Sequence, residues 1–112
     1  MKLIVGVIKP FKLDAVREAL SEIGINGITV SEVKGFGRQK GHTESHRAHE
    51  FAEELLPKLK LEVAVRAEML DAALAVIIKA ANSGRIGDGK LFVVNLERVV
   101  RVRTSESGPA AI

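Results

Sequence analysis

Two glycine-rich, charged segments hold the residues of this chain whose types and spacing suit chemistry. The segment Lys34-Gly-Phe-Gly-Arg-Gln-Lys-Gly41 combines glycines, which allow tight turns and close backbone approach, with cationic and amide side chains. The segment Asn82-Ser-Gly-Arg-Ile-Gly-Asp-Gly-Lys90 repeats this combination. Successive backbone N–H groups of such loops can point at one anion, so the pair favours a phosphate-bearing ligand. For either segment taken alone, a plain solvated loop is the alternative.

Length and composition indicate a single domain of 112 residues with a real core, because 46% of the residues are hydrophobic. The chain has no cysteine, which excludes disulfides and thiolate metal sites. A net charge of +3, four phenylalanines and no Tyr or Trp leave little for stacking bases, so we expect no direct nucleic-acid binding. The apolar start of the chain stops at Lys9-Pro10, and no apolar run approaches the roughly 20 residues of a membrane span. We therefore expect a cytoplasmic protein.

Apolar periodicity predicts the elements that position the two loops. Strands are expected over residues 2–9, 28–36, 58–66 and 91–96. The first helix is expected from the spacing of Leu13, Val16, Leu20 and Ile23, with Gly24 at its end. The second is expected from the spacing of Leu70, Ala73, Leu74, Ile77, Ile78 and Ala81, with Asn82-Ser83-Gly84 at its end. Residues 98–103 alternate again, which predicts a last short strand with Arg101 and Arg103 on one side.

The order of these elements predicts an α+β fold, a ferredoxin-like βαββαβ sandwich with an antiparallel sheet and two helices on one face. The other face of the sheet would be largely apolar, and a domain of this size has no further layer to cover it, so we expect a homo-oligomer. Residues 37–56 form a loop longer than compact domains usually contain, and such loops tend to be functional.

Several segments together resemble the PII family of nitrogen-regulatory signal-transduction proteins. They are Ile8-Lys-Pro-Phe-Lys-Leu13, Glu32-Val-Lys-Gly-Phe-Gly-Arg-Gln-Lys-Gly-His-Thr-Glu44, Leu56-Pro-Lys58, Gly84-Arg-Ile-Gly-Asp-Gly-Lys90 and Val100-Arg-Val-Arg-Thr104. The resemblance implies one PII-like domain over 1–112, a homotrimer, and sites for ATP or ADP in the clefts between subunits, where 2-oxoglutarate joins MgATP. It also implies a T-loop over 37–56, a B-loop over 82–90 and a C-terminal loop over 102–109. Such a protein is a non-catalytic sensor that docks onto its targets through the T-loop.

The same resemblance implies the residues that bind nucleotide. They are Ile28, Thr29, Gly35, Phe36, Gly37, Arg38, Gln39, Glu62, Ala64, Gly87, Asp88, Gly89, Lys90, Arg101 and Arg103. Physical chemistry agrees for the cations, because Arg can grip two phosphate oxygens at once. The alternative for Arg101 and Arg103 is an exposed edge-strand face, and for Glu62 it is a surface ion pair with Lys60 or a partner strand. Relatives often carry a larger aliphatic residue in place of Ala64. A backbone contact to the base would survive this change, whereas a side-chain contact would weaken.

A second ligand set is implied for 2-oxoglutarate. It comprises Gln39, Lys40, Gly41, Lys58 and Gly87. The side-chain oxygen of Gln39 would complete the Mg²⁺ shell, and Lys58 would pair with a carboxylate of 2-oxoglutarate. Because Gln39 stands at the base of the long loop, the ligand bound there would reset the conformation of the loop.

Arg47 resembles the loop-tip arginine with which family members plug ammonium channels. The expected partners are therefore an ammonium transporter, a nitrogen-metabolism enzyme or a transcription regulator, with membrane association only through a transporter. Enteric-type members carry loop tyrosines, but His46 and Phe51 stand at those places and the chain has no Tyr, so tyrosine nucleotidylation is excluded. An ordinary solvated loop serine is the preferred interpretation of Ser45, with phosphorylation as the alternative.

Three other interpretations compete with the nitrogen sensor. His42, His46 and His49 have borderline spacing for zinc or copper, which would suit a metal-responsive relative linked to metal efflux, but three solvated loop histidines are the preferred interpretation. Asp88 or Glu62 could orient a water near phosphates, but no Ser-His-Asp, paired-carboxylate or clustered-ligand arrangement occurs, so we expect no enzyme. A purely structural trimer would leave the two glycine-rich loops unexplained.

Overall fold

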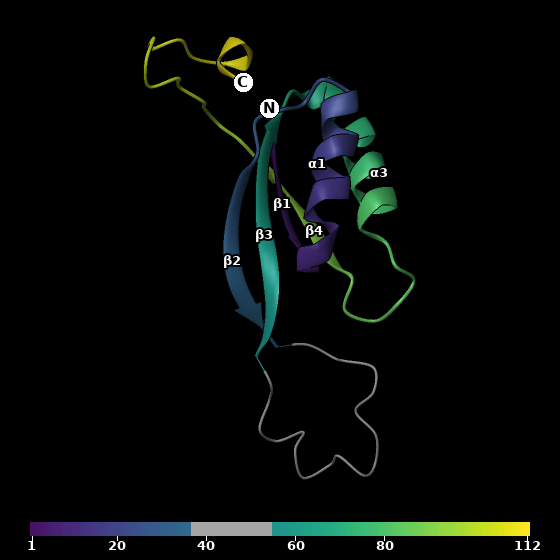
Figure 1. Ribbon diagram of the computed structural model, residues 1–112. Coiled ribbons are helices and arrows are strands. Elements are labelled where there is room, and N and C mark those ends of the chain that lie inside the picture. Colours follow the sequence, from purple (N-terminus) through teal and green to yellow (C-terminus); the bar gives the residue numbers. More distant parts are fainter. Residues whose placement is uncertain (37–54) are drawn as a thin grey trace, which may run out of the picture.

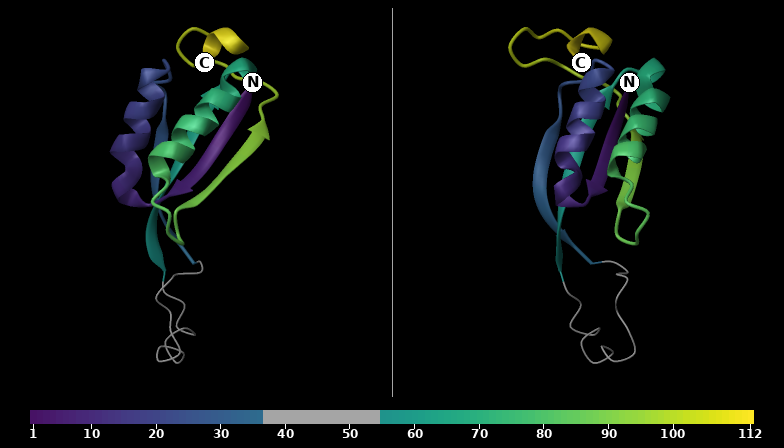
Figure 2. Two further views of the ribbon diagram at one scale, coloured as in Figure 1. Left: turned by 90° about the vertical axis from the view of Figure 1, so that its right-hand side faces the viewer. Right: turned by 45° about the vertical axis from the view of Figure 1, so that its right-hand side comes forward.

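A four-stranded antiparallel sheet with the order β2-β3-β1-β4 is the frame of the molecule (Figure 1). The structure is a computed structural model that describes residues 1–36 and 55–112. The strands are β1 (Lys2–Ile8), β2 (Thr29–Gly35), β3 (Leu56–Val65) and β4 (Gly89–Asn95). Helices α1 (Leu13–Glu22) and α3 (Leu70–Ala81) cover one face of the sheet, as the two turned views show (Figure 2). The predicted ferredoxin-like βαββαβ fold is confirmed.

Both helices begin after a short 3₁₀ turn, over Pro10–Lys12 and over Ala67–Met69. The end of α1 shows why Gly24 is needed, because its φ of 85° lies in the left-handed region. The N–H of Gly24 donates to the Ser21 carbonyl at 2.9 Å and the N–H of Ile25 donates to the Leu20 carbonyl at 2.9 Å, which satisfies the last carbonyls of the helix. The predicted helix end at this glycine is confirmed.

One hydrophobic core lies between the helices and the sheet. Its buried members are Ile4, Ile8, Val16, Leu20, Leu61, Val63, Val65, Ala73, Ile77 and Ala81. The predicted inward faces of both helices are confirmed with one exception. Ile78 is 55% exposed, because the buried stripe of α3 runs through Ala73, Ile77 and Ala81 and Ile78 lies beside it.

The sheet face opposite the helices is largely apolar over β1 and β4, as predicted, whereas β3 places Lys58, Lys60 and Glu62 on it. On β1 the inward-facing Ile4 and Ile8 are buried, whereas the intervening residues Leu3, Val5 and Val7 point to the helix-free face and are half-buried. On β4, Phe92 is 51% exposed and Val94 49% exposed on that same face. Exposed apolar side chains on a sheet face favour association, and the homotrimer stays a prediction.

The predicted last strand is wrong. Residues 98–103 form no strand, and only an isolated bridge joins Val100 to Ser107. The N–H of Arg101 donates to the Glu106 carbonyl at 2.8 Å and the N–H of Ser105 donates to the Arg101 carbonyl at 2.8 Å, so this segment closes on itself in a tight loop. An alternating sequence becomes a strand only where a neighbouring edge pairs with it, and the chain has already left the sheet here.

Three boundaries also differ from the predictions. Ile28 precedes β2, which begins at Thr29, and β4 begins at Gly89 rather than at Leu91. Leu56 starts β3 and so does not belong to the loop predicted over 37–56; the remainder of that loop, apart from Leu55, lies outside the described residues. Among the helices of the described chain, none is long and apolar enough to cross a membrane.

Candidate functional site

The B-loop, residues 82–90, connects α3 to β4 at the lower end of the sheet in Figure 1, where β2 ends and β3 begins. This end, formed by strand termini, is called the lower edge, and the opposite end of the strands is called the upper edge. Its glycines adopt backbone conformations that other residues avoid: φ is 78° at Gly84, 97° at Gly87 and 104° at Gly89. Gly89 is the most constrained, because an added Cβ would stand 1.7 Å from the carbonyl oxygen of Val7 on β1. Glycine therefore brings the loop and the start of β4 close against the sheet.

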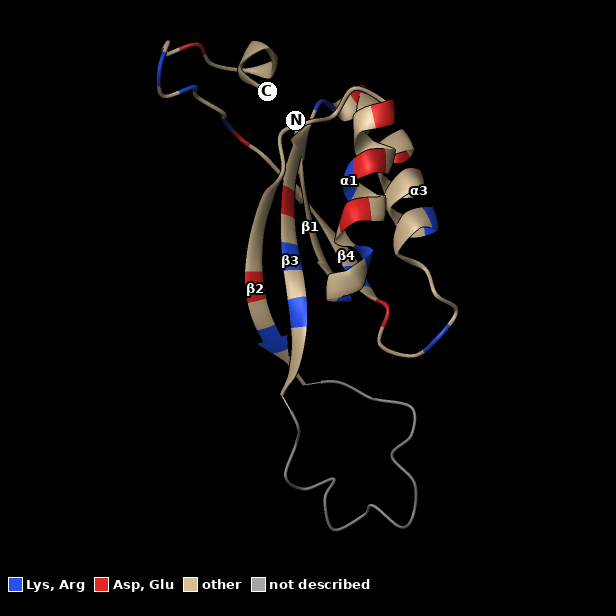
Figure 3. Ribbon diagram, viewed as in Figure 1, with Lys and Arg blue, Asp and Glu red and all other residues tan. Residues whose placement is uncertain are grey.

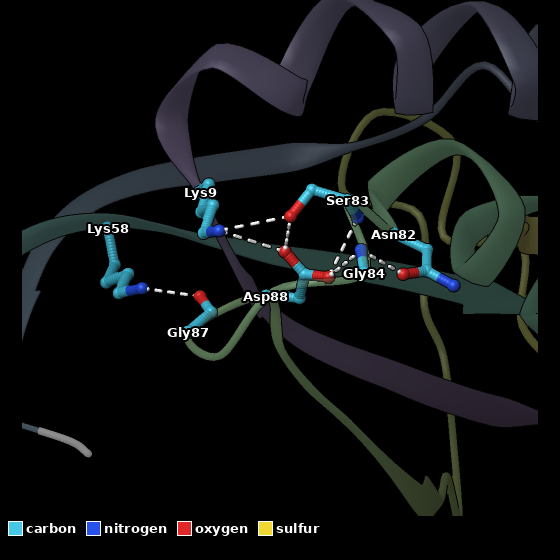
Figure 4. A network of polar contacts seen from close by, with 7 residues as sticks. All are labelled: Lys9, Lys58, Asn82, Ser83, Gly84, Gly87 and Asp88. Carbon is cyan, nitrogen blue, oxygen red and sulfur yellow. Dashed lines mark hydrogen bonds and ion pairs between the residues drawn. The ribbon is translucent and has the colours of Figure 1, made fainter. Parts of the chain in front are cut away.

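A network around the Asp88 carboxylate holds the B-loop in shape (Figure 4). Its Oδ2 accepts the backbone N–H groups of Ser83 at 2.7 Å and Gly84 at 3.0 Å. Its Oδ1 accepts the Ser83 hydroxyl and pairs with Lys9 Nζ at 3.1 Å, and Lys9 Nζ also donates to Ser83 Oγ at 3.1 Å. Hydrogen bonding by the Ser83 hydroxyl, with smaller help from the Ser83 amide and Lys9, holds the pKa of Asp88 well below its usual range. The carboxylate therefore stays ionised and is occupied within the loop.

Lys58 reaches the other side of the B-loop from β3. Its Nζ donates to the Gly87 carbonyl oxygen at 2.6 Å (Figure 4). Burial, and then the nearby Lys9 ammonium, lower the pKa of Lys58, while Asp88 opposes the shift. The structure thus brings together Lys58 and Gly87, two of the residues predicted for 2-oxoglutarate.

Positive charge gathers along this lower edge. Figure 3 shows basic residues on the lower parts of β2 and β3 and in the B-loop. Lys90 on β4 stands opposite Val7, which in turn stands opposite Lys60 on β3, so these side chains share the helix-free face. Gly35 and Phe36, at the end of β2, belong to the same edge. Such an edge can attract an anionic ligand.

A second group of predicted nucleotide residues lies toward the upper edge of the sheet. Thr29 is opposite Glu62 in the β2–β3 pairing, and Ala64 is opposite Leu3 in the β1–β3 pairing. Ile28 directly precedes β2. At roughly 3.3 Å per strand residue, Ala64 is about 20 Å from Lys58 along β3.

The segment after β4, residues 96–112, lies beyond the upper edge, where the chain ends (Figure 1), and it contains both C-terminal arginines. Arg101 pairs with Glu106 through Nη1 and Oε1 at 2.9 Å and donates from Nη2 to the Ala110 carbonyl at 3.3 Å. Arg103 is exposed. The expectation that both arginines project from one side of a strand is wrong, because the loop described above replaces that strand.

The predicted nucleotide residues therefore form two separate groups within one chain. The B-loop and Lys90 belong to the lower edge, whereas Thr29, Glu62, Ala64 and the two arginines belong to the upper end of the molecule. Several predicted residues lie outside the described residues: Gly37, Arg38, Gln39, Lys40, Gly41, His42, Ser45, His46, Arg47, His49 and Phe51.

Two residues of the site were not predicted as functional. In the sequence, Lys9 only marks the end of the first strand, and Ser83 is one residue of the glycine-rich loop. No local pattern indicated that both side chains contact Asp88. For metals, no group of three or more His, Cys, Asp or Glu residues within 1–36 and 55–112 could hold an ion, and the histidines of the metal hypothesis fall outside that part.

Comparison with known proteins identifies the family. The model of the family "Nitrogen regulatory protein P-II" matches residues 1–106. The chain belongs to the P-II family. It is 56% identical over 112 residues, the whole of both chains, to nitrogen regulatory protein GlnK of Escherichia coli K12. It is 55% identical over the whole of both chains to nitrogen regulatory protein P-II of Rhizobium etli, and 56% identical to nitrogen regulatory protein P-II 1 of Escherichia coli K12.

This membership confirms the predicted class of function. The P-II protein described here is a signal-transduction regulator of nitrogen metabolism and not an enzyme.

Proposed function

We propose that this P-II protein senses ATP or ADP together with 2-oxoglutarate, in sites formed between the copies of a homotrimer. The observation that supports this most is the separation of the predicted nucleotide residues into two groups at opposite ends of one chain. A ring of copies in head-to-tail contact can bring the lower edge of one chain to the upper end of the next. The apolar side chains of β1 and β4 on the helix-free face supply a surface for that association.

The lower group suits the phosphates and the second ligand. Gly87, Gly89 and Lys90 form the phosphate-binding part, with backbone approach from the glycines and charge from the lysine. Asp88 contributes through its backbone and through the shape of the loop, because its carboxylate is already occupied by Ser83, Gly84 and Lys9. Lys58 pairs with a carboxylate of 2-oxoglutarate beside Gly87, in company with Gln39, Lys40 and Gly41, and the side-chain oxygen of Gln39 completes the shell of Mg²⁺.

The upper group suits the base and completes the phosphate site from the neighbouring copy. Thr29, Glu62 and Ala64 line one side of the sheet where a base can lie. Arg101 keeps N–H donors beyond the two that contact Glu106 and Ala110, since a guanidinium carries five. Arg103 is exposed and ready to meet a phosphate.

The output of the sensor is the T-loop between β2 and β3, because Gly35 and Lys58 connect it directly to the ligand site. Arg47 docks onto an ammonium transporter, an enzyme of nitrogen metabolism or a transcription regulator in the cytoplasm. The protein meets the membrane only through such a transporter. Nucleotide and 2-oxoglutarate bias the loop between states by about 1–3 kcal/mol of coupling free energy.

Calorimetric titration tests the proposal. The protein is titrated with ATP and Mg²⁺, and 2-oxoglutarate is then titrated into the protein with and without MgATP. We expect 2-oxoglutarate to bind only when MgATP is present. Failure of ATP to bind would overturn the nucleotide assignment, and binding of 2-oxoglutarate to the nucleotide-free protein would overturn the joint site.

A further inference from the structure

Lys9 and Ser83 are not among the residues predicted to contact a ligand, but both contact the Asp88 carboxylate of the B-loop. We propose that Lys9 and Ser83 are positioning residues which, through Asp88, hold the B-loop in the conformation that binds the phosphate groups. The proposal rests on the function proposed above, since it assigns the B-loop to phosphate.

The loop needs such a restraint because of its composition. Glycine has more conformational freedom in the unfolded chain than any other residue type, and this segment contains Gly84, Gly87 and Gly89. That freedom is lost when the loop adopts one shape. The Asp88 carboxylate offsets this loss by accepting both the N–H and the hydroxyl of Ser83. The segment between Ser83 and Asp88 is thereby closed into a ring at its two ends.

Lys9 ties this ring to the sheet. It directly follows β1, the strand between β3 and β4, and its side chain is 17% exposed. The single Nζ contacts Asp88 Oδ1 and Ser83 Oγ, each at 3.1 Å, so it meets both ends of the ring. A charge-assisted pair of this kind, partly withdrawn from water, restrains the loop more than a fully exposed ion pair does.

The network around Asp88 leaves several backbone N–H groups of the B-loop available to a ligand. The N–H groups of Arg85, Ile86 and Gly87 donate to no acceptor among the residues that the structure describes. They lie in the closed segment between Ser83 and Asp88, so the ring sets their direction. Such a set of unused N–H groups is what a phosphate needs, and its geometry depends on Asp88 staying where Lys9 and Ser83 hold it.

The test compares nucleotide affinity in Lys9→Met and Ser83→Ala with that in two controls. Lys12→Met removes a lysine from the same stretch of chain, and Ser21→Ala removes a serine whose hydroxyl bonds Asn26 far from the B-loop. We expect each of the first two variants to weaken ATP binding about threefold to tenfold, and the controls to bind like the wild type. Lys9→Arg and Ser83→Thr retain the contacts and should restore most of the affinity.

A double variant separates positioning from direct contact. If Lys9 and Ser83 act through one carboxylate, Lys9→Met combined with Ser83→Ala weakens ATP binding little more than either change alone. The amide resonances of Arg85–Gly87 should also move in the same direction in both single variants without ligand. A merely structural role would lower the melting temperature and leave ATP affinity and these resonances unchanged.

Three outcomes overturn the proposal. ATP affinity in Lys9→Met and Ser83→Ala equal to that of the controls removes the positioning role. Fully additive losses in the double variant assign Lys9 to direct phosphate contact instead. A wild-type protein that binds no ATP removes the proposed function itself, and the positioning role with it.

Discussion

Replacement of Gly89 by alanine should destabilise the protein more than any other glycine change compared here. The new Cβ would stand 1.7 Å from the Val7 carbonyl oxygen and 2.8 Å from its carbon, so β1 and β4 must separate. The φ of 104° adds backbone strain. Strain of about 1–3 kcal/mol and overpacking of about 1–3 kcal/mol together predict a loss of about 2–6 kcal/mol in the free energy of unfolding.

Two matched glycines serve as controls. Gly84 has a φ of 78° with nothing within 4 Å of an added Cβ, so Gly84→Ala should cost only the strain, about 1–2 kcal/mol. Gly27 has open space and no left-handed backbone, so Gly27→Ala should be neutral or stabilise by about 0.4–1 kcal/mol through the unfolded chain.

Urea unfolding measures this series at one fixed chain concentration, because the stability of an oligomer depends on concentration. From the most to the least stable, the predicted order of the variants is Gly27→Ala, Gly84→Ala and Gly89→Ala. Equal stability of the Gly84 and Gly89 variants would refute the close approach of the B-loop to β1 as the reason for this glycine.

Three further predictions concern charged residues of the site. Lys58→Ala should remove 2-oxoglutarate binding and spare ATP, because loss of one charge-assisted partner costs about 2 kcal/mol or more; calorimetry that finds unchanged 2-oxoglutarate affinity would reject the assignment. Arg103→Ala should weaken ATP binding while Arg98→Ala does not, and equal affinities would remove Arg103 from the site. The pKa of Asp88 is lowered in the folded state, so its contribution to stability is present above about pH 4 and is lost as the pH falls further. Acid unfolding of Asp88→Asn should therefore depend less steeply on pH there, and an unchanged slope would contradict the network around this carboxylate.

Local periodicity predicted much of the fold. The helix α3 spans Leu70–Ala81, the range that its apolar spacing indicates, because a helix of this length is specified by its own amphipathic pattern. The segment 98–103 shows the limit of such reasoning. Its alternation has the period of a strand, but a strand requires an edge to pair with, and the edge is a property of the whole sheet.

The site was predicted only as a set of residues. Their identities followed from glycine, charge and resemblance, but their division between two ends of the molecule depends on strand register, which no local pattern states. The contact between Lys9 and Asp88 joins residues far apart in the sequence and becomes visible only when β1 and the B-loop meet. For the same reason, Ser83 could not be separated in advance from an ordinary loop serine.

In the proposed trimer, each nucleotide site combines the lower edge of one chain with the C-terminal arginines of another. Mixed oligomers test it most directly. Lys90→Ala and Arg103→Ala chains are purified separately, each with weak ATP binding, and are then unfolded together and refolded at equal amounts. If the sites lie between copies in a head-to-tail ring, about one site in four should regain both side chains and wild-type ATP affinity. If each site lies within one chain, no mixture will regain wild-type ATP affinity, which would contradict sites formed between copies.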